Sequence, residues 1–160
     1  MLDADEFRAV MGSFATGVTV LTFPEKTHGM TANAFSSVSL DPPLLLVCID
    51  HDTNSYELIE EHDVTGFCVN MLTAEQQHLG EYFANMRELD ESPFETEATT
   101  SAETGAPVFS ESLAYADCTV WDSTVAGDHT IYIGEILDAG VLDEDAEALT
   151  FFRGNWGTLS

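Results

Sequence analysis

The sequence predicts a mainly β fold, an antiparallel barrel with a few flanking helices. Many short segments rich in β-branched and aromatic residues are separated by turn-forming residues, a pattern typical of strands. Few segments show helical spacing, and strands do not alternate regularly with helices, which disfavours a parallel doubly wound sheet. A chain of 160 residues can bury one substantial core, so we expect a single domain over residues 1–160.

Three helices are expected, all before residue 87. The first is predicted by apolar residues spaced three and four apart, namely Phe7, Val10, Met11 and Phe14. We expect it to end at Gly17. The second should run to about Glu61 from a cap at Thr53, Asn54 or Ser55, since a short polar side chain there accepts from a free backbone N–H. The third is expected from Thr73 or Ala74 to about Met86.

The strands are predicted from runs of apolar and β-branched residues. They are expected over residues 18–23, 30–39, 44–49, 64–71, 113–126, 129–142, 150–153 and 156–159. The run 44–49 is apolar at every position, which predicts a central strand buried on both faces. Gly127 and Asp128 favour a turn between the two longest segments and predict a hairpin. Residues 87–105 show little pattern.

The chain is strongly acidic, with 29 Asp and Glu residues against 4 Lys and Arg and a formal net charge of −25. Because 44% of the residues are hydrophobic, the charge indicates an acidic surface rather than disorder. Such a surface repels itself at low ionic strength, and molar salt shortens the Debye length to about 3 Å. We therefore expect a protein adapted to a halophile's cytoplasm; an unusually acidic mesophilic protein is the alternative. Nucleic acids and anionic membranes are disfavoured as partners.

Cysteine usage and the lack of a targeting segment point to the cytoplasm. Cys48, Cys68 and Cys118 are odd in number and have apolar or β-branched neighbours, which favours buried thiols over disulfides or a zinc site. The sequence shows no signal-peptide pattern and no apolar run of roughly 20 residues. We expect a soluble cytoplasmic protein.

Most familiar catalytic patterns are missing from the sequence. It has no GxGxxG or other glycine-rich phosphate loop, no nucleophile elbow and no paired-histidine metal pattern, which disfavours a Rossmann enzyme or a serine hydrolase. His28, His51, His62 and His78 show no metal-ligand spacing and are interpreted as surface or pocket-edge residues. We expect no metal.

The segment Gly29–Leu44 is unusually rich in hydroxyl and amide groups beside a buried strand. These are Thr31, Asn33, Ser36, Ser37 and Ser39. One interpretation is a solvent-facing strand edge whose hydroxyls bond to the backbone. The other is a ligand with many hydrogen-bonding atoms, because buried polar groups require partners.

An ordered series of short motifs along nearly the whole chain resembles the flavin reductase-like family. The series is Phe7-Arg8 through Gly12, Phe14 to Val20, Gly29 to Ser39 with Pro42-Pro43, Val69 to Leu72, Gln76-Gln77 with Phe83, Gly105-Ala106-Pro107, Gly127-Asp128-His129 with Gly134, and Gly154 with Trp156. Each motif alone is weak. Their order and compatible spacing make the resemblance specific.

The resemblance implies a fold, an activity and partners. The fold would be an FMN-binding split β-barrel, antiparallel and Greek-key-like, working as a homodimer whose interface completes the flavin pocket. The activity would be NAD(P)H-dependent reduction of FMN, with FAD also possible and NADH and NADPH both open. Reduced flavin or electrons would go to a partner such as a monooxygenase.

The resemblance also implies the residues that bind the cofactor. Thr31, Ala32, Asn33 and Ala34 would face the isoalloxazine ring, Ser37 and Ser39 its pyrimidine edge or ribityl chain, and Asn54 and Ser55 the phosphate. A helix N-terminus at Asn54 and Ser55 would independently suit an anion. Trp156 stands where relatives often carry Tyr, and its role is open between ring stacking and core packing, with packing favoured.

His129 is the candidate catalytic residue, expected from the resemblance to orient the nicotinamide over the flavin. A solvated histidine at a hairpin exit is the alternative interpretation. Two other functions also stay open. One is a non-catalytic FMN-binding electron carrier or flavin chaperone of the same fold. The other is a pyridoxamine-phosphate-oxidase-like enzyme, which lacks a visible cluster of basic phosphate-binding residues.

Overall fold

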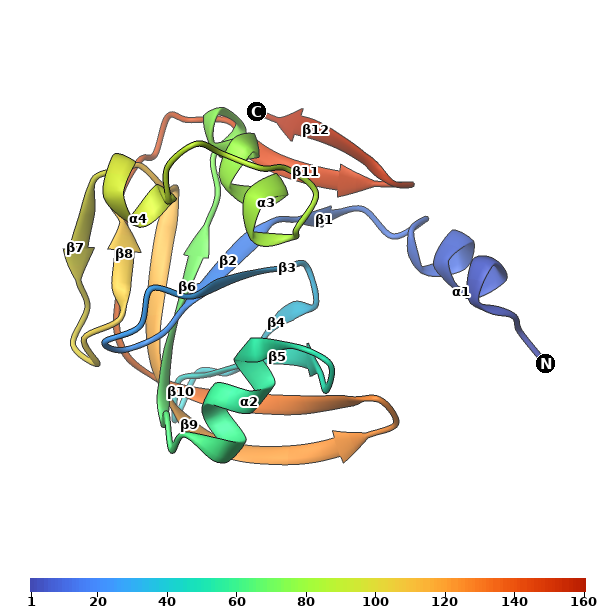
Figure 1. Cartoon of the computed structure of the whole chain (residues 1–160), viewed down its shortest axis with the longest axis horizontal. Helices are drawn as coiled ribbons and strands as arrows, with labels where there is room; N and C mark the ends of the chain where they lie inside the picture. The colour runs from blue at the N-terminus through green and yellow to red at the C-terminus, as the bar shows by residue number, and fades with distance from the viewer.

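The computed structural model describes all 160 residues and consists mainly of antiparallel strands (Figure 1). The strands are β1 (Thr16–Gly17), β2 (Thr19–Thr22), β3 (Gly29–Ala32), β4 (Phe35–Ser39), β5 (Leu44–Asp50), β6 (Gly66–Met71), β7 (Thr99–Ser101), β8 (Pro107–Phe109), β9 (Ala114–Ala126), β10 (His129–Val141), β11 (Ala148–Phe152) and β12 (Asn155–Leu159). The helices are α1 (Ala4–Met11), α2 (Asn54–Glu61), α3 (Gln77–Phe83) and α4 (Pro93–Thr96), with a 3₁₀ turn η1 (Ala74–Gln76). The prediction of a mainly β antiparallel fold is confirmed.

Seven strands form the main sheet, in the order β3-β2-β6-β9-β10-β5-β4. Its two edges, β3 and β4, follow one another in the chain, and no ladder joins them. The sheet is therefore open along this line, as in a split barrel. Strands β1, β11 and β12 form a second sheet, and β7 and β8 form a third.

The predicted hairpin is present as β9 and β10, the two longest strands of the protein. Gly127 in its turn has a φ of +68°, a conformation that favours glycine. Register shifts at Ile133/Gly134 and at Ile136/Asp138 bend the pair. The hairpin extends past the end of the barrel at its Gly127 turn (Figure 1).

The larger of the two main hydrophobic clusters lies between the seven-stranded sheet and α2. Leu45, Val47 and Ile49 of β5 contribute to it and are almost fully buried, whereas Leu44, Leu46 and Cys48 on the opposite face are only half-buried. The expectation that both faces of β5 would be buried is therefore wrong. One face of β5 packs on the main core, and the residues on its other face are only partly covered within this chain.

Two of the predicted helices end earlier than expected. Helix α1 ends at Met11 with Gly12 as its C-cap, because the chain turns at residues 12–14 and enters β1. The predicted helix 73–86 begins as the 3₁₀ turn η1 and ends at Phe83. Helix α2 has the predicted bounds, and Thr53 is its cap among the three candidates.

The segment 87–105, which shows little pattern in the sequence, contains α4 and β7. Ser92 caps α4 by accepting from the Phe94 N–H at 3.3 Å, and Pro93 occupies its first turn. All three cysteines are free, with Cys68 and Cys118 fully buried and Cys48 half-buried. No helix of the structure has the length and apolarity needed to cross a membrane.

Candidate functional site

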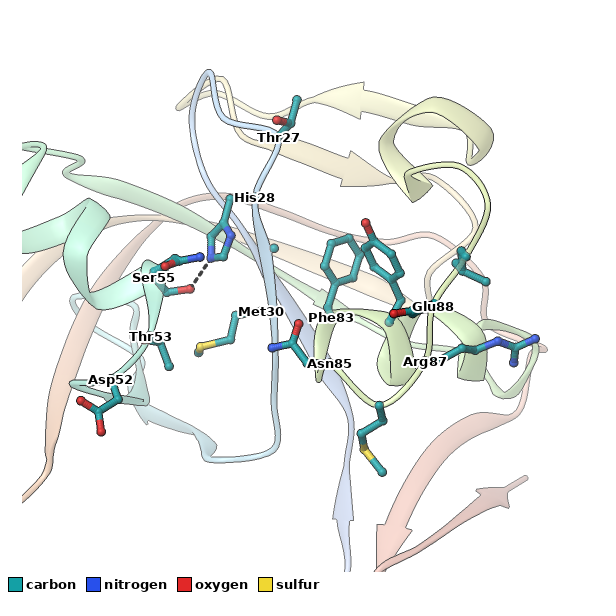
Figure 2. Close-up of a pocket in the computed structure, with 15 residues that line it drawn as sticks. Thr27, His28, Met30, Asp52, Thr53, Ser55, Phe83, Asn85, Arg87 and Glu88 are labelled. Atoms are coloured by element: carbon teal, nitrogen blue, oxygen red, sulfur yellow. Dashed lines mark hydrogen bonds between the residues drawn. The ribbon is translucent and has the colours of Figure 1, made fainter.

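The largest cavity of the protein has a volume of about 740 Å³ and lies at the open side of the barrel. Three segments line it, residues 27–30 at the start of β3, residues 52–55 at the start of α2, and residues 82–89 except Ala84 at the end of α3 and beyond (Figure 2). Sites for small molecules and cofactors usually have volumes of about 300–1,000 Å³. The cavity therefore has the size of a cofactor site.

The N-terminus of α2 presents free hydrogen-bond donors at this cavity. The Thr53 hydroxyl accepts from the Tyr56 N–H at 3.2 Å and donates to the Asp50 carbonyl at 2.7 Å. The backbone N–H groups of Asn54 and Ser55 find no acceptor in the protein. Free first-turn amides and the positive end of a helix dipole favour an anion.

Ser55 lies beneath His28 in the cavity wall. Ser55 is fully buried, and its Oγ lies 2.8 Å from Nε2 of His28 (Figure 2). The His28 ring also stacks on Phe23, with 5.7 Å between ring centroids. Burial lowers the pKa of His28 from its ordinary value. The His28 imidazole is the more exposed of the two side chains, and the buried Ser55 hydroxyl is hydrogen-bonded to it.

Strand β3 and the residues after it border two smaller cavities. One, of about 370 Å³, lies against β1 and β2, and the other, of about 220 Å³, includes Thr31, Asn33, Met86 and Trp156. Because Met86 also lines the largest cavity, the second small cavity adjoins it. Asn33 lines both small cavities, and its side-chain amide has no hydrogen-bond partner in the protein.

Two other predicted flavin contacts on β3 are engaged within the protein. Thr31 Oγ1 donates to the Gly80 carbonyl at 2.6 Å, which ties β3 to α3. Ala32 is buried, and its carbonyl accepts from Thr19 Oγ1 at 2.6 Å. The Thr31 hydroxyl is therefore already hydrogen-bonded within the protein, and the side-chain amide of Asn33, directly after β3, is the polar group available to a ligand.

Trp156 packs against the protein and also borders a cavity. Its ring meets Phe151 edge-on, with 5.0 Å between centroids, and lies about 3.1 Å from where a Cβ on Gly80 would stand. An alanine at position 80 would therefore press on the indole. Trp156 therefore packs within the protein at the wall of the 220 Å³ cavity, and its role toward a flavin stays a prediction.

Ala34, Ser37 and Ser39 line none of these three cavities. Ser37 is exposed on β4, the edge strand of the main sheet, and its carbonyl accepts from Ser36 Oγ at 3.0 Å. The Ala34 carbonyl accepts from the Cys48 N–H at 3.1 Å. Within one chain, the structure does not bring these predicted contacts together with Asn54 and Ser55.

His129 begins β10 opposite Asp50 of β5 and also lies outside the largest cavity. Its Nδ1 is 2.7 Å from Asp128 Oδ1, and its side chain is 41% exposed. The hydrogen bond from His129 and its charge lower the pKa of Asp128. A carbonyl of the same turn, that of Asp128, accepts from the His51 N–H at 3.0 Å, beside the segment that leads into α2.

The model of the flavin reductase like domain matches residues 11–160 of this chain, which is nearly all of it. The chain belongs to the flavin reductase-like family. The solved flavin reductase PheA2 has the same fold, with a TM-score of 0.88, 38% sequence identity and 99% of each chain covered. The prediction of an FMN-binding split β-barrel is thereby confirmed.

Curated relatives of this flavin reductase-like chain differ in the flavin that their names give. An FMN reductase (NADH) of Agrobacterium fabrum is 38% identical, over 96% of this chain and 85% of that protein. An NADH-dependent FAD reductase of Streptomyces globisporus is 36% identical, over 86% and 76%. The reductase subunit of a flavin-dependent monooxygenase of Rhodococcus jostii is 32% identical, over 97% and 77%.

Several residues that line the largest cavity of the flavin reductase-like chain carry no signal for binding in the sequence. No motif contains Tyr82 or Asn85, and Phe83 stands in the motif series without an assigned binding role. His28 was interpreted as a surface or pocket-edge residue. Its position directly before the Gly29–Ser39 motif was the available signal, but the bond to Ser55 joins residues far apart in the sequence.

Proposed function

We propose that this protein is an NADH-dependent flavin reductase that binds FMN in the 740 Å³ cavity. The observation that carries the proposal is the pair of free N–H groups of Asn54 and Ser55 in the wall of that cavity. Helix α2 has eight residues, so its N-terminus has both the amides and the dipole to hold a phosphate. Family membership and the named activities of the relatives support the same function.

The residues around the cavity fit a flavin. Asn33 has a free amide for the polar edge of the ring, and Phe83, Met30 and Met86 provide apolar surface. A bound flavin accepts a hydride from reduced nicotinamide, and the protein's task is to hold the two rings face to face at reactive distance. In this proposal Asn54 and Ser55 hold the phosphate end and His129 orients the nicotinamide. No side chain has to donate a proton to the reacting atoms.

FMN is the flavin that we propose, although the relatives include both FMN and FAD reductases. A single phosphate at the end of the ribityl chain meets the single helix N-terminus at the cavity. The adenylate half of FAD would need a further binding surface beyond this cavity.

A homodimer is part of the proposal. Ala34, Ser37, Ser39 and His129 lie outside the largest cavity of their own chain, so a second copy would supply the wall that joins these residues to the flavin. Helix α1 supports this arrangement because none of its residues is buried in the single chain. A flavin-dependent monooxygenase is the proposed recipient of reduced flavin, as the Rhodococcus relative's name suggests.

NADH oxidation by the purified protein in molar salt, with and without added FMN, tests this function. The colour of the protein as isolated is recorded first, and NADPH and FAD are compared with NADH and FMN under the same conditions. We expect turnover that rises with added FMN. A yellow protein that leaves both NADH and NADPH unoxidised would instead indicate a flavin-binding electron carrier or chaperone.

A further inference from the structure

We propose that His28 contacts the phosphate of the bound flavin and that Ser55 acts by positioning the His28 ring. This inference rests on the proposed function, because it concerns the same cavity. It makes the Ser55 hydroxyl a support for the neighbouring imidazole, while the backbone N–H of Ser55 stays a proposed phosphate donor. It also makes His28, which no motif singled out, a cofactor-binding residue.

The geometry places His28 between Ser55 and the cavity. Both residues line the cavity, but Ser55 has no exposed surface, whereas His28 is partly exposed. Stacking on Phe23 and the 2.8 Å bond from Nε2 to the Ser55 hydroxyl restrict the ring on two sides. The second ring nitrogen, Nδ1, has no partner in the protein. An oriented ring with one free nitrogen at a cavity wall is suited to bind a ligand.

The charges around the cavity favour a cationic partner for an anionic ligand at this position. The carboxylates of Asp52 and Glu88 line the same cavity, and its one arginine, Arg87, is 3.9 Å from Glu81. Glu25 and Lys26 precede His28 on the same loop, and Tyr82 at the end of α3 lines the same cavity. A phosphate beside the α2 N-terminus would face two negative groups. A protonated His28 would add a positive charge beside the free amides of Asn54 and Ser55.

This arrangement makes phosphate binding depend on the protonation of His28. In the free protein burial lowers the pKa of His28, so the ring is neutral near pH 7. A phosphate at hydrogen-bond distance raises that pKa, and binding then takes up a proton between the two pKa values. The contribution of His28 to affinity is therefore largest below the lower pKa and disappears above the higher one.

Binding of FMN and of riboflavin, which lacks the phosphate, tests the inference when both are titrated across about pH 6 to 8.5 by flavin fluorescence. The variant His28→Gln keeps a hydrogen-bonding side chain without a titratable charge. We expect its FMN Kd, relative to the unaltered protein, to be about tenfold higher at the acidic end and nearly equal at the alkaline end. The titration of the phosphate of free FMN, with a pKa of about 6, is the same in both experiments, so the ratio reports what happens in the two complexes.

Three comparisons separate a binding role from a structural one. The riboflavin Kd should be the same for His28→Gln and the unaltered protein at every pH. Ser55→Ala should change the FMN Kd in the same direction as His28→Gln but less. His62→Gln, the same change at an exposed histidine paired with Glu57 at 3.5 Å, should change neither Kd.

Either of two results would overturn the inference. If the ratio of the FMN Kd of His28→Gln to that of the unaltered protein does not vary with pH, the charge on His28 does not contribute to phosphate binding. An equal loss of riboflavin and FMN affinity would show that His28 only maintains the fold of the cavity. If the unaltered protein binds neither flavin, the proposed function fails, and the inference fails with it for a different and recognisable reason.

Discussion

His129 is held by its own hairpin and lies outside the largest cavity, unlike the proposed phosphate contacts Asn54 and Ser55. The Asp128 carboxylate fixes Nδ1 at 2.7 Å and leaves Nε2 of the ring free of partners in the protein. A partner at one nitrogen sets the tautomer and direction of an imidazole. A residue held in this way can orient a second ligand without contributing to flavin binding.

We therefore expect His129→Ala to raise the KM for NADH about tenfold, as loss of one hydrogen bond of about 1.4 kcal/mol would do, with the FMN Kd unchanged. Steady-state kinetics and flavin titration give the two constants. His62→Ala, at an exposed histidine outside the largest cavity, is the control and should alter neither. A parallel loss of FMN affinity in His129→Ala would assign the residue to the flavin site instead.

The cysteines lead to a second expectation at the scale of single residues. Burial, followed by the charge of Asp117, raises the pKa of Cys118 to about 12, and burial raises the pKa of Cys68 well above its ordinary value. Thiolates are the reactive form, so both should be inert at about pH 8 in the native protein. Cys48 is only half-buried and should react first.

A thiol-specific disulfide reagent followed by mass spectrometry measures this order directly. We expect modification of Cys48 alone in the native protein and of all three cysteines after unfolding in urea. Equal rates at the three sites before unfolding would contradict the burial of Cys68 and Cys118 on the sheet.

Helix α1 is the one helix with no buried residue in the chain. Asp3 caps it by accepting from the N–H groups of Asp5 and Glu6, yet none of its residues is buried. Phe7, Val10 and Met11 are each more than half exposed. Figure 1 shows the helix projecting away from the sheets. An isolated helix of eight residues is marginal in water, so α1 needs an apolar surface from outside the chain.

If that surface is a second copy, a charge on the apolar face of α1 should weaken the dimer. We expect Phe7→Glu to shift the protein from dimer toward monomer in sedimentation velocity. Ala9→Glu adds the same charge on the opposite face of the helix and should leave the dimer intact. A dimer of unchanged stability in Phe7→Glu would exclude α1 from the interface.

At the scale of the whole molecule, the most unusual property is its large negative charge, which affects the stability of the folded state. The net charge of −25 is opposed by few cations, and two of the three arginines pair with carboxylates at 3.3 and 3.9 Å. Such pairs contribute little at a surface, so most carboxylates have no neutralising partner. Their mutual repulsion destabilises the folded state and is screened by salt.

We therefore expect the midpoint of thermal unfolding to rise by roughly 10 °C between low and molar KCl, equivalent to about 3 kcal/mol. Circular dichroism measures the midpoint. Near the isoelectric point of about 4.1 the net charge vanishes, and the effect of salt should shrink. A salt effect of the same size at both pH values would show that screening of the carboxylates is not its cause.

Local sequence was sufficient for the elements whose signals lie within a few residues. Alternating apolar residues and the Gly127-Asp128 turn identified the β9–β10 hairpin, and the α2 helix was recognised together with the group of residues that caps it. The ends of α1 and α3 were missed because helix termini depend on where the chain must turn to join the next strand. The half-buried face of β5 was missed because the layers that cover the two faces of a strand are set by the tertiary fold and not by the local sequence.

The candidate site was predictable only in part, for the same physical reason. The motif containing Asn33 and the helix start at Asn54 were found from the sequence, since each is a continuous stretch. The cavity itself joins residues 27–30, 52–55 and 82–89, and only the tertiary structure brings these segments together. The bond between His28 and Ser55 spans 27 positions, so the partner of each side chain was decided by packing and not by its neighbours in the chain.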